Sequence, residues 1–122
     1  MVINTAPMTV EQFDEWVMLP NNIGMNYEYI GGEIKPVVAH GYSSRITAII
    51  IYEIIAYLRR TGTEGKVTAP DGGYQIAGER YIPDVAYSKD PSSTKGYNPI
   101  TPDLVVEVIS EPLSAKERAA LH

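Results

Sequence analysis

Residues 104–110 read Leu-Val-Val-Glu-Val-Ile-Ser, an almost continuous apolar run that a single acid, Glu107, interrupts. A run of this kind is typical of a strand that is buried on both faces of a sheet. An unpaired carboxylate in such a strand costs several kcal/mol, because water no longer solvates its charge. The sequence therefore predicts that Glu107 has a partner, either a cationic side chain or a metal ion.

A second acid can be placed opposite Glu107 by strand register. Residues 81–88 are predicted to form a strand that pairs antiparallel with residues 104–110. If Ser88 lies opposite Asp103, the same register puts Asp84 opposite Glu107, with Cβ atoms about 4.5–5.5 Å apart on one face. A slip of one residue would put the two acids on opposite faces and remove the pair.

Two carboxylates at this separation repel each other unless a cation lies between them or one of them is protonated. A magnesium ion suits the pair, since it takes one or two carboxylates together with waters and substrate phosphate. Two simpler interpretations stay open. Asp84 could bond nearby backbone at a strand end, and Glu107 could pair with Arg80 or Arg45.

The remaining elements predict an α+β domain, or α/β in the broad sense, with helices against a mixed sheet. Thr9 and Gln12 have capping-box spacing at the start of a helix over residues 9–19. The Gly31-Gly32 pair predicts a tight hairpin between residues 27–30 and 33–35. A long helix is expected over residues 43–60, with Ser43 or Ser44 as its N-cap. Its wide apolar stripe, predicted to be buried against the sheet, comprises Ile46, Ile49, Ile50, Ile54, Tyr57 and Leu58.

Composition restricts the class of protein. A chain of 122 residues is long enough for one domain with one core. It has no cysteine, which excludes disulfides and thiolate zinc sites and favours the cytoplasm. No stretch is apolar and long enough to span a membrane. The net charge of −5 argues mildly against a nucleic-acid coating protein, but a metal-dependent nuclease concentrates carboxylates at its site.

Four motifs in order carry a family resemblance: Tyr-Glu-Tyr-Ile-Gly-Gly-Glu-Ile at 27–34, His40 before the long helix, Ile-Pro-Asp-Val-Ala at 82–86 and Pro-Asp-Leu-Val-Val-Glu-Val-Ile-Ser at 102–110. Together they resemble the Uma-two family of restriction-endonuclease-like proteins. That family is similar to the PD-(D/E)XK nuclease superfamily.

The resemblance implies a restriction-endonuclease-like core in which Asp84 and Glu107 hold magnesium or manganese. It makes Glu28 and His40 further catalytic candidates. The superfamily has a lysine two residues after the second acid, where this chain has Ile109. In the family the lysine is expected from the following helix, whose lysine here is Lys116. The resemblance also implies that the family's domain continues beyond His122.

Two functions follow from the sequence. The first is a magnesium-dependent endonuclease that hydrolyses DNA phosphodiester bonds, in which a lysine orients or deprotonates the attacking water. The second is a catalytically inactive relative that serves as a binding or dimerisation module, possible as a homodimer because a sheet edge invites pairing. The acid pair favours the first function, and Ile109 favours the second.

Overall fold

The first helix is short and capped as the sequence predicts. The computed structural model describes residues 8–37 and 41–109. Helix α1 spans Val10–Trp16, and Thr9 and Gln12 form the expected capping box. The helix ends three residues earlier than predicted, because the last backbone N–H groups bond three residues back, from Met18 to Glu15 and from Leu19 to Trp16. Such tight final turns satisfy the carbonyl groups at a helix end.

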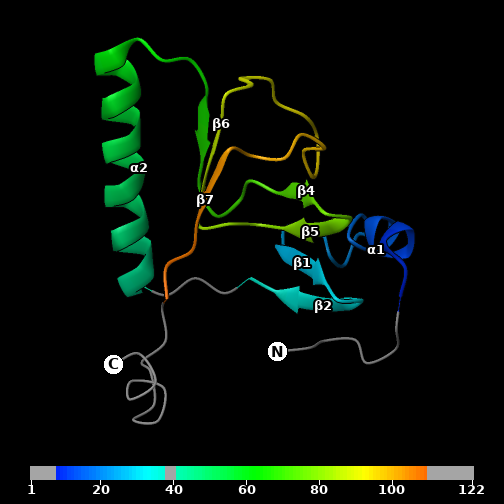
Figure 1. The fold of residues 1–122 in the computed structure, drawn as a ribbon. Helices are drawn as coiled ribbons and strands as arrows, with labels where there is room; N and C mark the ends of the chain where they lie inside the picture. Colours follow the sequence, from blue (N-terminus) through cyan, green and yellow to red (C-terminus); the bar gives the residue numbers. More distant parts are fainter. Residues whose placement is uncertain (1–7, 38–40, 110–122) are drawn as a thin grey trace, which may run out of the picture.

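A four-stranded antiparallel sheet, in the order β2-β1-β5-β4, lies beside α1 (Figure 1). Strands β1 (Tyr27–Ile30) and β2 (Glu33–Pro36) form the predicted hairpin. Gly31 and Gly32 have φ values of 62° and 79°, the left-handed conformation that a two-residue turn of this type requires. Pro36 ends β2, which is an edge strand as expected, since proline cannot donate to a further strand.

The other half of this sheet is a hairpin that sequence reasoning missed. Strands β4 (Tyr74–Ile76) and β5 (Glu79–Tyr81) are joined by Ala77 and Gly78, with φ values of 51° and 78°. An alanine with positive φ is uncommon, so the residue types gave a weak turn signal.

A separate three-stranded sheet, in the order β3-β6-β7, lies between the first sheet and α2 (Figure 1). Its strands are β3 (Lys66–Thr68), β6 (Val85–Ser88) and β7 (Leu104–Val106). All strand pairs in both sheets of the described residues are antiparallel. The α+β class is therefore confirmed, but two antiparallel sheets replace the expected mixed sheet.

The predicted strand over residues 81–88 divides into β5 and β6, one in each sheet. Pro83 lies between them and has no backbone N–H to donate to a ladder. The chain leaves the first sheet at Tyr81 and joins the second at Val85. This transfer positions Asp84 at the junction of the two sheets.

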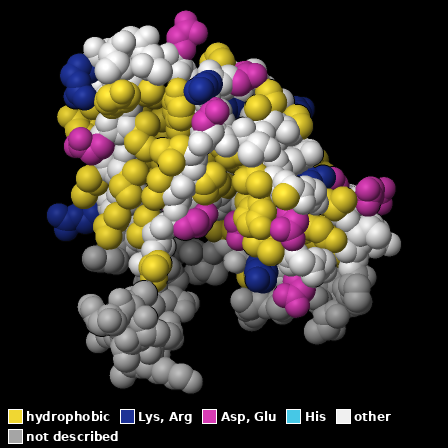
Figure 2. All heavy atoms as spheres, in the orientation of Figure 1, with side chains coloured by type: hydrophobic (Ala, Val, Ile, Leu, Met, Phe, Trp, Pro, Cys, Tyr) yellow, Lys and Arg dark blue, Asp and Glu magenta, His cyan; other side chains and the backbone are white. Residues whose placement is uncertain are grey.

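Helix α2 spans Gly41–Thr61 and packs against β3 and β6. It begins two residues before the predicted cap and is followed by Gly62 at φ 68°, the expected stop. The predicted burial of its whole apolar stripe is wrong, because Ile49 and Tyr57 are 53% and 52% exposed. The narrow sheet covers one side of the helix, and hydrophobic side chains gather over α2 and its neighbouring strands on the face in Figure 2.

An aromatic core cluster includes Phe13 of α1. Phe13, Tyr27, Tyr29 and Ile34 are buried together, and Trp16 is among the partly buried residues that pack against them. The rings of Phe13 and Tyr29 have centroids 5.3 Å apart, and those of Trp16 and Tyr27 4.8 Å apart. Aromatic pairs at these distances stabilise a core beyond simple burial. No helix among the described residues is long and apolar enough to cross a membrane.

Candidate metal centre at the junction of the sheets

The register of β6 and β7 is the one that the sequence predicts. Val85 lies opposite Val106, Ala86 opposite Val105, and Tyr87 opposite Leu104. Asp84 and Glu107 are the next residues outward on the two strands, immediately beyond the last ladder pair. The two acids therefore meet where the strands end, beside the junction with the other sheet.

The carboxyl of Asp84 is held by backbone. Its Oδ2 accepts a hydrogen bond from the Val108 N–H at 2.6 Å. This bond continues the attachment of the two strands after their ladder stops, and it orients the carboxylate. Asp84 thus has the local backbone role that the simpler interpretation gave it, and it lies beside Glu107 as well.

Glu28 reaches the same place from β1. Its Oε2 accepts a hydrogen bond from the Ile82 N–H at 2.9 Å, which ties β1 to the segment between the sheets. Burial raises the pKa of Glu28, while the bond from Ile82 and the charge of Lys35 lower it. Glu28 is therefore half-buried and held by backbone, unlike a solvated acid on a hairpin.

Glu107 is the most perturbed acid of the described chain. Burial, followed by the negative charges of Asp84 and Glu28, raises the pKa of Glu107 to about 7. The residue as a whole is exposed, but its carboxyl lines a hollow together with Asp84. Two neighbouring carboxylates repel each other when both are ionised, and this repulsion favours the protonated form of Glu107.

The hollow that contains the three acids measures about 580 Å³ and lies between the two sheets and the start of α2. Helix α2 contributes polar residues to its wall, including the buried Thr47. Asn26 and Asp71 close another side, with the Asn26 amide donating to Asp71 Oδ1 at 2.7 Å. Its volume lies within the range of about 300–1,000 Å³ that is usual for small-molecule sites.

Arg80, one of the two arginines that could have neutralised Glu107, is used elsewhere. Arg80 projects from the other face of the four-stranded sheet and donates to both oxygens of Asp14, from Nε at 3.0 Å and from Nη2 at 2.9 Å. This pairing contradicts the simpler interpretation for Arg80. Asp84 and Glu107 are thus close together without help from that arginine.

Comparisons with known proteins agree with the motifs. The sequence matches the family model Uma2, described as "Putative restriction endonuclease", over residues 10–120. The chain belongs to the Uma2 family. No curated protein matches the sequence of this Uma2 chain.

One solved structure with a similar fold is that of a "putative nuclease belonging to DUF820" from Anabaena variabilis ATCC 29413. The two share 20% sequence identity with a TM-score of 0.68, and the alignment covers 94% of the Uma2 chain. The Uma2 chain spans 65% of the length of that protein. This likeness shows the nuclease-like fold.

The donor set of the Uma2 chain fits a magnesium ion held by a pair of carboxylates. The described residues contain no group of three or more potential ligands arranged around one metal position. Magnesium does not require one, because it keeps several waters and commonly takes one or two carboxylates. The raised pKa of Glu107 supports this fit, since a divalent cation would relieve the same repulsion that now favours a proton.

At the position where the superfamily has its lysine, this chain has another residue. Ile109 occupies that position and is 72% exposed. Lys116 and His40 lie outside the described residues. Within them, Lys35 lies directly opposite Glu28 in the β1–β2 register. The hairpin turn could have predicted this neighbour, whereas nothing in the sequence indicates the Val108 and Ile82 backbone donors.

Proposed function

We propose that this Uma2 chain is a magnesium-dependent endonuclease that hydrolyses DNA phosphodiester bonds. The observation that carries the proposal is the meeting of Asp84 and Glu107 beyond the end of the β6–β7 ladder, with the pKa of Glu107 raised to about 7. Perturbed acids in a hollow are typical of catalytic sites. Magnesium, or manganese in its place, would polarise the phosphate and lower the pKa of a bound water.

The residues of the chain have distinct parts in this proposal. Asp84 and Glu107 would hold the cation, and the Val108 N–H keeps Asp84 turned towards the site. Glu28 is fixed by Ile82 and would orient a water at the edge of the hollow. His40 and Lys116 remain candidates for moving a proton, and Lys35 joins them because it neighbours Glu28.

The first experiment is a metal titration followed by thermal melting. Millimolar Mg²⁺ or Mn²⁺ is expected to raise the melting temperature of the wild type, because a ligand that binds only the folded state stabilises it. The melting temperature of an Asp84→Ala, Glu107→Ala double variant should not change. A Glu53→Gln, Glu64→Gln variant is the control, because both side chains are exposed and neither lines the hollow. Equal shifts in all three proteins would contradict the metal site.

The second experiment measures cleavage of plasmid and oligonucleotide DNA with Mg²⁺, Mn²⁺ or a chelator. Nicks that depend on the metal and on Asp84 would support the nuclease. A metal-binding chain that leaves all DNA substrates intact would favour the inactive alternative.

The alternative function is a binding or dimerisation module, and Ile109 is the observation in its favour. Among the described residues, strand β7 lies at an edge of its sheet, and Leu104 and Val105 are 47% and 41% exposed there. An exposed apolar edge can pair with a second copy of the chain. Sedimentation of the wild type and a Val105→Lys variant would test this, since a dimer through β7 should be lost in the variant.

A further inference from the structure

A second hollow adjoins the acids on the side away from α2. It measures about 460 Å³ and lies between the open face of the four-stranded sheet and β7. Its walls are Ile30, Ile76, Ala77, Tyr81 and Val105, with Glu28 and Glu107 at the border. The same two acids line the larger hollow, so the two spaces meet at the candidate metal centre.

Strand alternation explains why this face is open. Tyr27 and Tyr29 turn towards the core under α1, so Glu28 and Ile30 project from the opposite face of β1. Tyr81 is fixed beside them, because its hydroxyl donates to Glu79 Oε1 at 2.8 Å. The other oxygen of Glu79 accepts the Gly31 N–H. The polar end of Tyr81 is thus satisfied by the sheet, and its ring is left to line the hollow.

The chemistry of these walls selects a flat, uncharged group. Aliphatic side chains and one tyrosine ring favour an aromatic heterocycle, which gains from stacking. The carboxylates of Glu28 and Glu107 disfavour a second phosphate at the border, and they can accept hydrogen bonds from an amino group. A nucleobase has this combination of an apolar face and amino donors.

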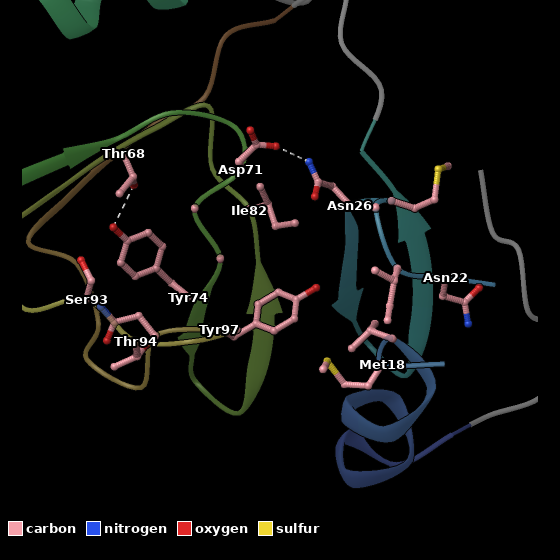
Figure 3. Close-up of a pocket in the computed structure, with 18 of the residues that line it drawn as sticks. Met18, Asn22, Asn26, Thr68, Asp71, Tyr74, Ile82, Ser93, Thr94 and Tyr97 are labelled. Atoms are coloured by element: carbon pink, nitrogen blue, oxygen red, sulfur yellow. Dashed lines mark hydrogen bonds between the residues drawn. The ribbon is translucent and has the colours of Figure 1, made fainter. Parts of the chain in front are cut away.

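A third hollow, elsewhere in the chain, fits a nucleobase less well. It measures about 490 Å³, and Figure 3 shows Tyr74 and Tyr97 within it. Tyr74 is 1% exposed and bonds Thr68, and the hydroxyl of Tyr97 donates to the Tyr27 carbonyl. Asn26 and Asp71, whose hydrogen bond Figure 3 shows, line both this hollow and the hollow of the acids.

We propose that the hollow bounded by Tyr81 and Val105 binds an unpaired nucleobase beside the phosphodiester that the acids address. The inference rests on the proposed nuclease function and specifies its substrate as single-stranded nucleic acid, or duplex with a base turned out. A paired base cannot enter, since pairing keeps the base in its stack.

The test measures binding and cleavage separately. Short single-stranded DNA is titrated with the wild-type chain in Ca²⁺ and followed by fluorescence anisotropy, beside a duplex of the same sequence. In a series of strands, one abasic site is moved along the sequence. Single-stranded DNA should bind more tightly than duplex, and one abasic position should weaken binding about tenfold, as loss of one stacked base does.

Matched tryptophan variants locate the effect. Val105→Trp fills the hollow and should weaken binding of intact DNA about tenfold, while binding of the abasic strand stays unchanged. Ile49→Trp is the control, because Ile49 is 53% exposed on α2 and lines neither hollow at the acids.

Three results would overturn the inference: no binding of single-stranded DNA, equal affinity for every abasic strand, or equal effects of the two tryptophan variants. The abasic series keeps the test decisive even if Val105→Trp fails to fold. Hollow-dependent binding without cleavage in Mg²⁺ would instead uphold the base site and contradict the nuclease. Cleavage that does not depend on the abasic position would uphold the nuclease and contradict the base site.

Discussion

The two faces of the four-stranded sheet treat buried charge in opposite ways. On the α1 face, Arg80 and Asp14 form a two-pronged ion pair, and the arginine side chain is 8% exposed. On the other face, Glu28, Asp84 and Glu107 line one hollow, where burial and the neighbouring charges raise the pKa of Glu107. The chain neutralises charge where the fold needs it and leaves it unbalanced at the candidate site. Such an arrangement is costly in the free chain and favours a bound cation.

The largest expected effect is on catalysis. Asp84→Asn should lower the rate of DNA cleavage about 100-fold or more, because it weakens binding of the cation that stabilises charge on the phosphate. Asp14→Asn, on the other face, should retain cleavage measured at a temperature where both variants are folded. Equal losses in the two variants would mean that the two faces do not differ in function.

The next effect is on stability. Arg80→Met should lower the free energy of unfolding by about 2 kcal/mol, because it leaves Asp14 without its partner in a half-exposed position. Urea denaturation measures this change. The double variant Arg80→Met, Asp14→Leu should recover part of the loss, and a double variant as unstable as the single one would argue against the ion pair as the cause.

Metal affinity should depend on pH. Because the pKa of Glu107 is raised to about 7, its proton competes with the cation below that pH. Magnesium should therefore bind about tenfold more weakly at pH 6 than at pH 8. Calorimetric titration at the two pH values tests this, and Glu107→Gln should bind weakly at both. A pH-independent affinity in the wild type would contradict the role of Glu107.

The smallest effect concerns the metal-free chain. The pKa of Glu107 lies above its ordinary value of 4.5, so the folded state holds a proton that the unfolded state releases. Stability from this group is therefore complete below pH 4.5 and is lost as the pH rises towards 7. Between acid and neutral pH, the free energy of unfolding of Glu107→Gln should rise relative to that of the wild type. The rise should be less than about 1 kcal/mol, because solvent screens the group. Melting curves across the range in chelator measure it, and a relative loss would reverse the sign.

Local signals predicted the elements well. The capping box of Thr9 and Gln12, the Gly31-Gly32 turn and the Gly62 stop all depend on neighbouring residues, and all three are present. The Ala77-Gly78 turn was missed because alanine seldom adopts a positive φ. Burial of α2 was overestimated, since an apolar stripe says nothing about the width of the sheet that covers it.

The sequence by itself determined that Asp84 lies opposite Glu107 if Ser88 lies opposite Asp103, because one pairing on two antiparallel strands fixes all others; the structure has the register that was assumed. That register brings Asp84 and Glu107 together at the strand ends. Only the tertiary structure decided that Pro83 lies where the chain passes between two sheets, that Glu28 joins the acids from β1, and that Arg80 serves Asp14 instead. These contacts join residues as many as 66 positions apart, and their partners depend on packing, which no local pattern encodes.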